Sequence, residues 1–127
     1  ADYSGETVFD RVLIEVLPVP VIYVVKSSPY VNDATMSDAL AAGLDTCATL
    51  IEKGAHAAGT TLPLCSEQFR SQFEKAPLII AKGQANFETL SDAGEKVFCL
   101  LQVKCPIIGL DLGVPVGSII ARQSTIR

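Results

Sequence analysis

The feature that most constrains the fold is an apolar run, residues 77–81, that passes directly into a polar segment. Such a run is typical of a buried strand, and Lys82 stands just past its carboxyl end. Ligands bind at this end of the strands in open α/β sheets. A lysine there supplies a mobile positive charge for a phosphate, and Gly83 lets the backbone come close to a ligand. We therefore predict a strand that ends at an anion-binding turn, with an ordinary polar loop as the alternative.

A second polar cluster surrounds Asp33 and follows another strand-like run. We predict that Asp33 or Asn32 caps a helix over residues 34–42, because short polar side chains satisfy the free N–H groups at a helix start. Thr35 and Asp38 also have the spacing of a capping box. A metal-ligating role for Asp33 is the alternative, and both roles place its carboxylate at a helix start near a sheet edge.

The chain start carries a third cluster, because Asp2 and Glu6 precede an amphipathic segment. A helix over residues 7–17 is predicted by apolar residues with i, i+4 spacing at positions 8, 9, 12, 13, 16 and 17. Acidic residues at or before the first turn of a helix complement its dipole. This is the structural alternative to a functional role for the two acids.

Apolar runs and helical periodicity alternate along the chain. The predicted elements are helix 7–17, strand 20–26, helix 34–42, a short strand near 46–51, helix 66–75, strand 77–82, a turn or short helix around 87–93, strand 97–104 and a short strand at 119–120. This order predicts a parallel sheet, and strand runs without polar alternation predict cover on both faces of that sheet. The length of 127 residues suits one α/β domain of catalytic type over residues 1–127.

Composition argues against two classes of partner. The net charge of −4, with scattered basic residues, gives no electrostatic footprint for nucleic acid. No apolar run reaches the roughly 20 residues that a membrane helix needs, because Pro18 and Pro20 break the longest one. With no membrane segment and no visible signal peptide, we predict a cytoplasmic protein. The sequence leaves the oligomeric state open.

Cysteine and histidine usage gives little support to other catalytic chemistry. The four cysteines form no Cys-x-x-Cys pair, so a zinc or redox motif is unsupported. The single histidine, His56, lies among small residues that are typical of a loop. Serine-type and cysteine-type triads therefore have weak support.

Taken together, the polar clusters resemble the motifs of the damage-control phosphatases, a family of metal-dependent phosphatases first catalogued as domain of unknown function 89. The resemblance rests on Asp2-Tyr3-Ser4-Gly5-Glu6, Asn32-Asp33-Ala34-Thr35, Lys82-Gly83-Gln84-Ala85-Asn86-Phe87-Glu88, Val103-Lys104-Cys105 and Gly113-Val114-Pro115-Val116-Gly117. No single piece is specific, but their order and spacing are. The resemblance implies a Rossmann-like three-layer α/β sandwich with a mostly parallel sheet, and a divalent metal ion such as Mg, Mn, Co or Ni.

The resemblance also implies roles for individual residues. Asp2 and Asp33 become catalytic metal ligands, and the sequence leaves open whether Asp2 acts as nucleophile or base instead. The implied substrate-binding residues are Glu6, Asn32, Lys82, Gly83, Asn86 and Lys104. Of these, Glu6 and Asn32 would orient the metal, its waters or the sugar.

Two features depart from the family pattern. Tyr3 stands where the family has an asparagine, and a neutral phenol is a poor substitute for an amide carbonyl on a hard cation. The family also carries a mostly helical N-terminal region, whereas one residue precedes Asp2 here. The chain is therefore expected to be the C-terminal half of such a protein.

The resemblance implies a metal-dependent phosphatase that hydrolyses phosphate esters of small metabolites, such as sugar phosphates or damaged phosphorylated metabolites. A non-catalytic binding or subunit-like module that kept the fold and lost the metal site is the alternative, because of Tyr3. A flavodoxin-like nucleotide binder ranks last, because the chain has no Gly-x-Gly-x-x-Gly or phosphate-loop motif.

Overall fold

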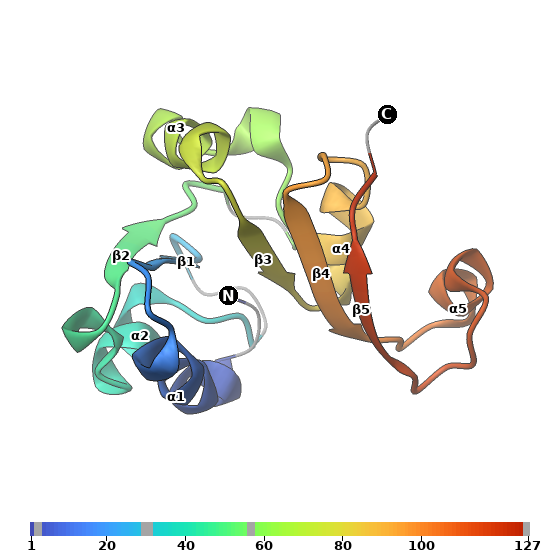
Figure 1. Ribbon diagram of the computed structural model, residues 1–127, viewed down its shortest axis with the longest axis horizontal. Coiled ribbons are helices and arrows are strands. Elements are labelled where there is room, and N and C mark those ends of the chain that lie inside the picture. The colour runs from blue at the N-terminus through green and yellow to red at the C-terminus, as the bar shows by residue number, and fades with distance from the viewer. Residues whose placement is uncertain (2–3, 29–31, 56–57, 126–127) are drawn as a thin grey trace. The chain divides into compact units, whose positions relative to one another are not determined.

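The computed structural model describes residues 1, 4–28, 32–55 and 58–125, and the chain divides into two compact units (Figure 1). Unit 1 comprises Ala1–Ala57 and Leu62–Glu74, and unit 2 comprises Ala58–Thr61 and Lys75–Arg127. Helices and strands alternate along both units, so the predicted α/β class is confirmed. The prediction of one domain over residues 1–127 stays a prediction.

Unit 1 is built around two parallel strands, β1 (Ile22–Val25) and β2 (Thr49–Glu52). Its other elements are α1 (Thr7–Val16), α2 (Met36–Ala41), α3 (Glu67–Lys75) and the 3-10 turns Ser4–Glu6, Leu44–Thr46 and Leu62–Leu64. Two apolar clusters form the core, one of Ile14, Tyr23, Val25, Ala39 and Leu44 and one of Ile51, Ala55, Cys65 and Phe69. The parallel pairing predicted from the order of elements is confirmed in this unit.

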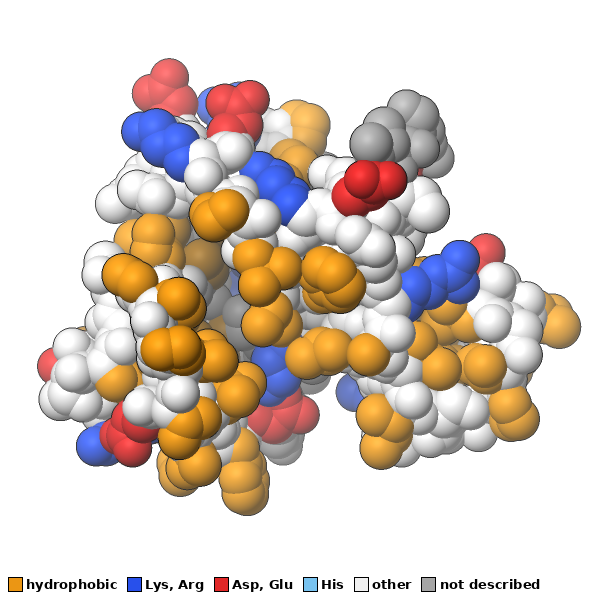
Figure 2. Space-filling view, viewed as in Figure 1, with side chains coloured by type: hydrophobic (Ala, Val, Ile, Leu, Met, Phe, Trp, Pro, Cys, Tyr) orange, Lys and Arg blue, Asp and Glu red, His pale blue; other side chains and the backbone are white. Residues whose placement is uncertain are grey.

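Helix α1 begins and ends close to the predicted limits, but it buries its more polar face. Thr7, Asp10 and Ile14 are buried, and the Tyr23 hydroxyl on β1 donates a hydrogen bond of 2.5 Å to the Asp10 carboxylate. The apolar residues that predict the helix are exposed, namely Val8, Phe9, Val12, Leu13 and Val16. Figure 2 shows hydrophobic side chains gathered at the surface over this helix. Periodicity thus predicts the helix correctly but not the face that packs on this unit.

The contact between α1 and β1 gives a testable prediction about stability. We expect Tyr23→Phe to lower the free energy of unfolding by about 2 kcal/mol, because it removes a buried hydrogen bond to a charged group. Chemical denaturation followed by circular dichroism would measure the change. Asp10→Asn keeps an acceptor for the hydroxyl and should have a smaller effect. An unchanged denaturation midpoint for Tyr23→Phe would contradict the prediction.

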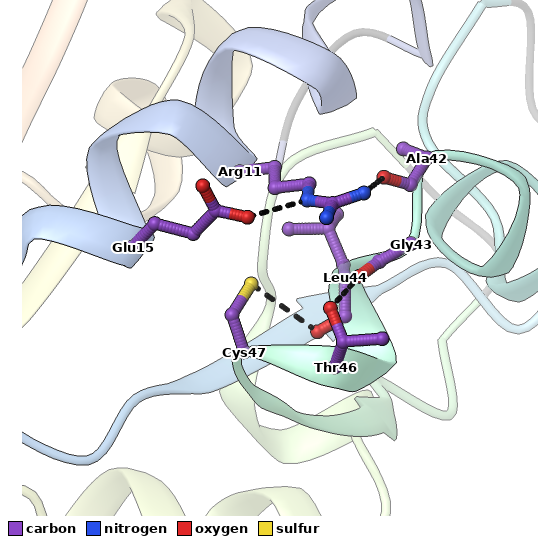
Figure 3. A network of polar contacts seen from close by, with 7 residues as sticks. All are labelled: Arg11, Glu15, Ala42, Gly43, Leu44, Thr46 and Cys47. Carbon is purple, nitrogen blue, oxygen red and sulfur yellow. Dashed lines mark hydrogen bonds and ion pairs between the residues drawn. The ribbon is translucent and has the colours of Figure 1, made fainter.

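The end of α2 is fixed by a glycine and by an arginine from α1 (Figure 3). Gly43 follows Ala42 with a φ of 75°, a left-handed conformation that favours glycine after a helix. The Arg11 guanidinium donates to the Ala42 carbonyl at 3.1 Å and to the Glu15 carboxylate at 2.7 Å. The helix therefore ends within one residue of its predicted limit, and α1 holds its last turn.

Unit 2 contains a three-stranded sheet in the order β3-β4-β5. Strand β3 (Ile79–Lys82) pairs parallel with β4 (Val97–Gln102), and β5 (Ile119–Gln123) pairs antiparallel with β4. Helix α4 (Gln84–Leu90) connects β3 to β4. The residues of β4 alternate between a buried and an exposed face, and the buried ones are Val97, Cys99 and Leu101. Unit 2 by itself therefore covers one face of this strand, which differs from the predicted cover on both faces.

Helix α5 (Pro106–Leu112) is absent from the predicted elements. The sequence does mark both ends of this helix. Pro106 is its first residue and Gly113, with a φ of 69°, directly follows its last residue, and both placements are typical of helices. Its apolar residues Ile107 and Leu110 are exposed, so no buried face marks it in the sequence. Among the described residues, no helix is long and apolar enough to cross a membrane.

Candidate active site

Asp33 lies beside the carboxyl end of β1. The backbone N–H of Lys26, one residue past β1, donates to the Ala34 carbonyl at 2.9 Å. Lys26 and Thr35 also form an isolated parallel bridge. The chain thus returns to the end of β1 just before α2 begins, and this return places Asp33 at the edge of the sheet where ligands bind in open α/β folds.

The cap of α2 is Thr35. This residue directly precedes Met36, the first helical residue, and its N–H donates to the Asp38 carboxylate at 2.9 Å. The predicted capping box of Thr35 and Asp38 is confirmed. The prediction that Asp33 or Asn32 caps the helix is wrong, because both lie upstream of the cap position. The Asp33 carboxylate therefore does not cap the start of α2.

The Asp33 carboxylate instead faces a buried lysine. Its Oδ2 atom lies 3.7 Å from Nζ of Lys26. The Lys26 side chain is 4% exposed, whereas that of Asp33 is 25% exposed. The pair thus places a carboxylate that a ligand can reach beside an ammonium group that is shielded from water.

The start of the chain lies next to Asn32. The Ser4 backbone N–H donates to the Asn32 carbonyl at 2.7 Å, and half-buried Glu6 ends the 3-10 turn that begins at Ser4. Two polar clusters that are far apart in sequence are therefore neighbours in unit 1. Asp2 lies outside the described residues, as does Tyr3, so the role of Asp2 as a metal ligand stays a prediction.

A second buried lysine stands at the end of β2. Lys53 follows Glu52, its backbone N–H donates to the Val25 carbonyl at 2.8 Å, and the residue is 4% exposed. Its side chain lies beside that of Lys26. Burial, and then the charge of Lys26, lower the pKa of Lys53 from 10.5 to about 8. The carboxyl ends of two adjacent parallel strands therefore bring two ammonium groups together.

Cys65 completes this group of side chains. The residue is buried, and the N–H of the following Ser66 donates to the Lys53 carbonyl at 3.0 Å. Burial raises the pKa of the Cys65 thiol, and the charges of Lys53 and Lys26 partly oppose that effect. A thiol with a raised pKa is protonated near neutral pH, so Cys65 adds no negative charge. We call Lys26, Asp33, Lys53 and Cys65 the lysine cluster.

Lys26 and Lys53 are not among the site residues predicted from the sequence. Lys26 directly follows an apolar strand-like run, as Lys82 does, whereas Glu52 separates Lys53 from the apolar pair Leu50-Ile51. What the sequence does not show is that β1 and β2 are neighbours in register, so that residues following the two strands meet. The importance of these lysines therefore emerges only from the pairing of the strands.

In unit 2, Lys82 ends β3 and Gly83 occupies the cap position of α4. Gly83 has a φ of 93° and a ψ of 155°, a conformation that is essentially restricted to glycine. Its N–H donates to the Leu100 carbonyl on β4 at 2.8 Å. The sharp turn from strand to helix explains why a glycine stands here, and the predicted strand followed by a turn at Gly83 is confirmed.

Asn86 is buried and supports this turn from within unit 2. Its side-chain amide nitrogen donates to the Lys82 carbonyl at 2.8 Å, and its amide oxygen accepts from the Thr60 hydroxyl at 2.7 Å. The Thr60 N–H in turn donates to the Thr89 hydroxyl at 2.8 Å. Asn86 therefore ties the segment around Thr60 to the end of β3. Its predicted contact with substrate stays a prediction.

Lys104 lies two residues past the end of β4, on the same edge of the sheet as Lys82. Its backbone N–H donates to the side-chain oxygen of Gln84 at 2.8 Å, and its side chain is exposed. The Gln84 amide nitrogen donates to Glu88 at 3.0 Å. Gln84 thus links the start of α4 to the segment after β4, and a lysine stands at or just past the carboxyl end of each of these two parallel strands.

The side-chain oxygens of Asp33 and Asn32 are of the kind that bind a hard divalent cation. Carboxylate and amide oxygens are ligands that Mg²⁺ and Mn²⁺ prefer, and Asp33 and Asn32 offer one of each. Within the described ranges, however, no group of three or more His, Cys, Asp or Glu side chains could hold a metal ion. A metal site beside Asp33 therefore needs further ligands, and Asp2 is the one that the sequence resemblance implies.

Comparison with known proteins identifies the family. The family model of the damage-control phosphatase ARMT1-like domain matches residues 1–120, so the chain belongs to this family. A damage-control phosphatase of Pyrococcus horikoshii is 39% identical over 99% of this chain and 46% of its own length. A damage-control phosphatase of Archaeoglobus fulgidus is 36% identical over 95% of the chain and 44% of its own length. The resemblance stated from the motifs is thereby confirmed.

A solved structure shows the same fold. The crystal structure of a DUF89 family protein from Pyrococcus horikoshii matches 98% of this chain and 45% of that chain, with a TM-score of 0.91 at 40% identity. The Rossmann-like α/β fold implied by the resemblance is therefore confirmed. The chain spans about half the length of the curated relatives that it matches.

Proposed function

We propose that the complete protein is a metal-dependent phosphatase that hydrolyses phosphate esters of small metabolites, such as sugar phosphates or damaged phosphorylated metabolites. Membership of the damage-control phosphatase family supports a phosphatase role. The metal, the substrate class and a cytoplasmic location are the parts of this proposal that go beyond family membership.

The observation that carries the proposal is the placement of Asp33. Thr35 and Asp38 form the cap of α2, so Asp33 is held at the end of β1 for another purpose. It is partly exposed beside a buried lysine. A carboxylate in this position, at the carboxyl end of a parallel strand, is suited to ligand binding rather than to stabilising a helix.

In this proposal Asp2 and Asp33 hold the metal ion, and Asn32 orients the ion or its waters. Such an ion, when bound, polarises a phosphoryl oxygen and lowers the pKa of a bound water. Glu6 is assigned to orient the sugar or the waters near the chain start, which is placed beside Asn32 by the hydrogen bond from Ser4. Whether Asp2 serves as a nucleophile or a base stays open in the proposal.

For unit 2, the proposal assigns Lys82 and Lys104 to the substrate phosphate. Both follow strand ends at one edge of a parallel pair, and an ammonium group there offsets charge on phosphate oxygens. Gly83 allows the backbone to approach the ligand, because it has no side chain. Asn86 holds the carbonyl of Lys82 and so fixes the turn that carries this lysine.

The test is release of inorganic phosphate from a panel of sugar phosphates by the complete protein. Mg²⁺, Mn²⁺, Co²⁺ or Ni²⁺ would be added separately, and a chelator would serve as the control. We expect turnover that depends on the metal and stops with the chelator. Absence of turnover with every metal, from protein shown to be folded, would contradict the proposal.

A second candidate is a non-catalytic module that kept the fold and lost the metal site. Tyr3 favours it, because a phenol replaces the amide of the family pattern at this position. Restoring the pattern with Tyr3→Asn separates the two functions. A phosphatase that tolerates Tyr3 turns over in both forms, whereas a module that lost its metal site turns over in neither or only after the substitution.

A further inference from the structure

Thr60 is a buried threonine that the phosphatase proposal leaves without a role. The residue is 4% exposed and belongs to the short segment Ala58–Thr61 of unit 2. Its hydroxyl donates to the side-chain oxygen of Asn86 at 2.7 Å, and its backbone N–H donates to the Thr89 hydroxyl at 2.8 Å. Thr60 is therefore fixed to α4 through both its side chain and its main chain.

Gly59 lets this segment lie close against α4. A Cβ atom on Gly59 would overlap the Ala85 carbonyl oxygen and come within 2.8 Å of the Thr89 hydroxyl oxygen. The residue also has a φ of 68°, a left-handed conformation that favours glycine. The close approach that a glycine permits allows the Thr60 hydroxyl to reach Asn86.

The peptide group between Lys82 and Gly83 is held from both sides. Its carbonyl accepts from the side-chain nitrogen of Asn86 at 2.8 Å, and its N–H donates to the Leu100 carbonyl at 2.8 Å. Asn86 is 6% exposed, and its amide oxygen accepts from Thr60. The opposite orientation of this amide would set its oxygen against the Lys82 carbonyl, and two acceptors do not pair. The hydrogen bonds thus run in one chain from Thr60 through Asn86 to the end of β3.

We propose that Thr60 is a positioning residue for Lys82. Its hydroxyl fixes the Asn86 amide, and the amide fixes the peptide group that follows Lys82. This peptide group sets the backbone from which the lysine side chain extends. A displacement of about 1 Å at a group that positions the substrate is sufficient to lower turnover strongly. The inference rests on the proposed function, which assigns Lys82 to the substrate phosphate.

A positioning role differs from a purely structural one in its dependence on Lys82. A threonine that only stabilises the fold affects activity to the same extent with and without the lysine ammonium group. A threonine that acts through Lys82 has no further effect on activity once that ammonium group is removed, because the effects of residues in one network do not add. A double-mutant cycle of Thr60 and Lys82 therefore separates the two roles.

The first measurement is kcat/KM of the complete protein for the sugar phosphate of the panel that gives the highest turnover. We expect Thr60→Val, which removes the hydroxyl and keeps the shape, to lower kcat/KM about tenfold. Thr60→Ser keeps the hydroxyl and should stay within about threefold of the unsubstituted protein. In a Lys82→Met background, Thr60→Val should lower kcat/KM by less than about twofold. Thr49→Val is the matched control at an exposed threonine of β2 and should leave kcat/KM unchanged.

The second measurement is amide hydrogen exchange of the complete protein by NMR, without substrate. The Gly83 N–H reports on the turn, and the Ile79 N–H, which donates to the Lys96 carbonyl at 2.9 Å, reports on the other end of β3. We expect Thr60→Val to accelerate exchange at least about tenfold more at Gly83 than at Ile79, because local opening of the turn adds to any global loss of stability. Thr60→Ser should leave the ratio of the two rates unchanged. Thr60→Ala is measured in parallel as a second variant without the hydroxyl, in case Thr60→Val does not fold.

The outcomes separate this inference from the phosphatase proposal. Equal acceleration at Gly83 and Ile79 in the folded variants without the hydroxyl overturns the inference, whether or not the protein hydrolyses phosphate esters. Unchanged kcat/KM in Thr60→Val overturns it too, as does an equal loss with and without the Lys82 ammonium group. Faster exchange confined to the turn, in a protein that hydrolyses no sugar phosphate, supports Thr60 as the residue that holds the Lys82 peptide group and contradicts the phosphatase proposal alone.

Discussion

Replacing Asp33 with asparagine is expected to lower the proposed metal-dependent phosphatase activity of the complete protein by about 100-fold or more. Asparagine keeps the size of the side chain but removes the negative charge that a divalent cation requires. Changes in residues that only support metal ligands already reduce metal affinity or activity by roughly 10–100-fold. A direct ligand should matter at least as much, and higher metal concentrations should recover part of the activity.

The measurement is phosphate release over a range of metal concentrations, with Asp111→Asn as the control. Asp111 is an exposed aspartate on α5, so the same substitution there should leave activity unchanged. Asp33→Asn also removes the charge that faces Lys26 at 3.7 Å, so the melting temperature of each variant must be compared. A folded Asp33→Asn variant that retains activity within a few fold would place the metal elsewhere.

Local sequence signals account for most of the secondary structure. The spacing of Thr35 and Asp38 predicts the cap of α2, and the predicted helix after Ser66 is confirmed, since the Ser66 hydroxyl accepts from the Phe69 N–H at 3.1 Å. The turn at Gly83 follows from the apolar run before it. These features depend on residues within a few positions of one another, which is why a single sequence is sufficient to predict them.

The parts that sequence reasoning missed depend on contacts between distant segments. The apolar stripe of α1 predicts a helix but not its orientation, which in unit 1 is set by the buried pair of Asp10 and Tyr23. Lys26 and Lys53 are 27 positions apart and meet only because β1 and β2 pair in register. Strand-end position and the family resemblance both drew attention to Asp33 and Lys82, but the resemblance gave no reason to consider the two buried lysines.

The lysine cluster should make the protein less stable at neutral pH than a variant without Lys53. The pKa of Lys53 falls from 10.5 in its ordinary state to about 8 in the folded protein, chiefly because of burial and next because of Lys26. The unfolded chain therefore binds more protons between pH 8 and 10.5, so the free energy of unfolding rises with pH across this range. Below about pH 8 the charged lysine destabilises the fold by up to roughly 3 kcal/mol.

We therefore expect Lys53→Met to increase the free energy of unfolding at pH 7 by up to about 3 kcal/mol, and the gain to shrink towards zero as the pH rises to 10.5. Lys26, Asp33 and Cys65 stand beside position 53 in both proteins. Urea denaturation at a series of pH values would measure this difference in the free energy of unfolding. The control is Lys75→Met at an exposed lysine, which should change stability by no more than about 0.5 kcal/mol.

A Lys53→Met variant that is no more stable at pH 7, or a difference that does not change with pH, would mean that Lys53 carries no destabilising charge. In that case the folded protein would not hold the pKa of Lys53 below its ordinary value.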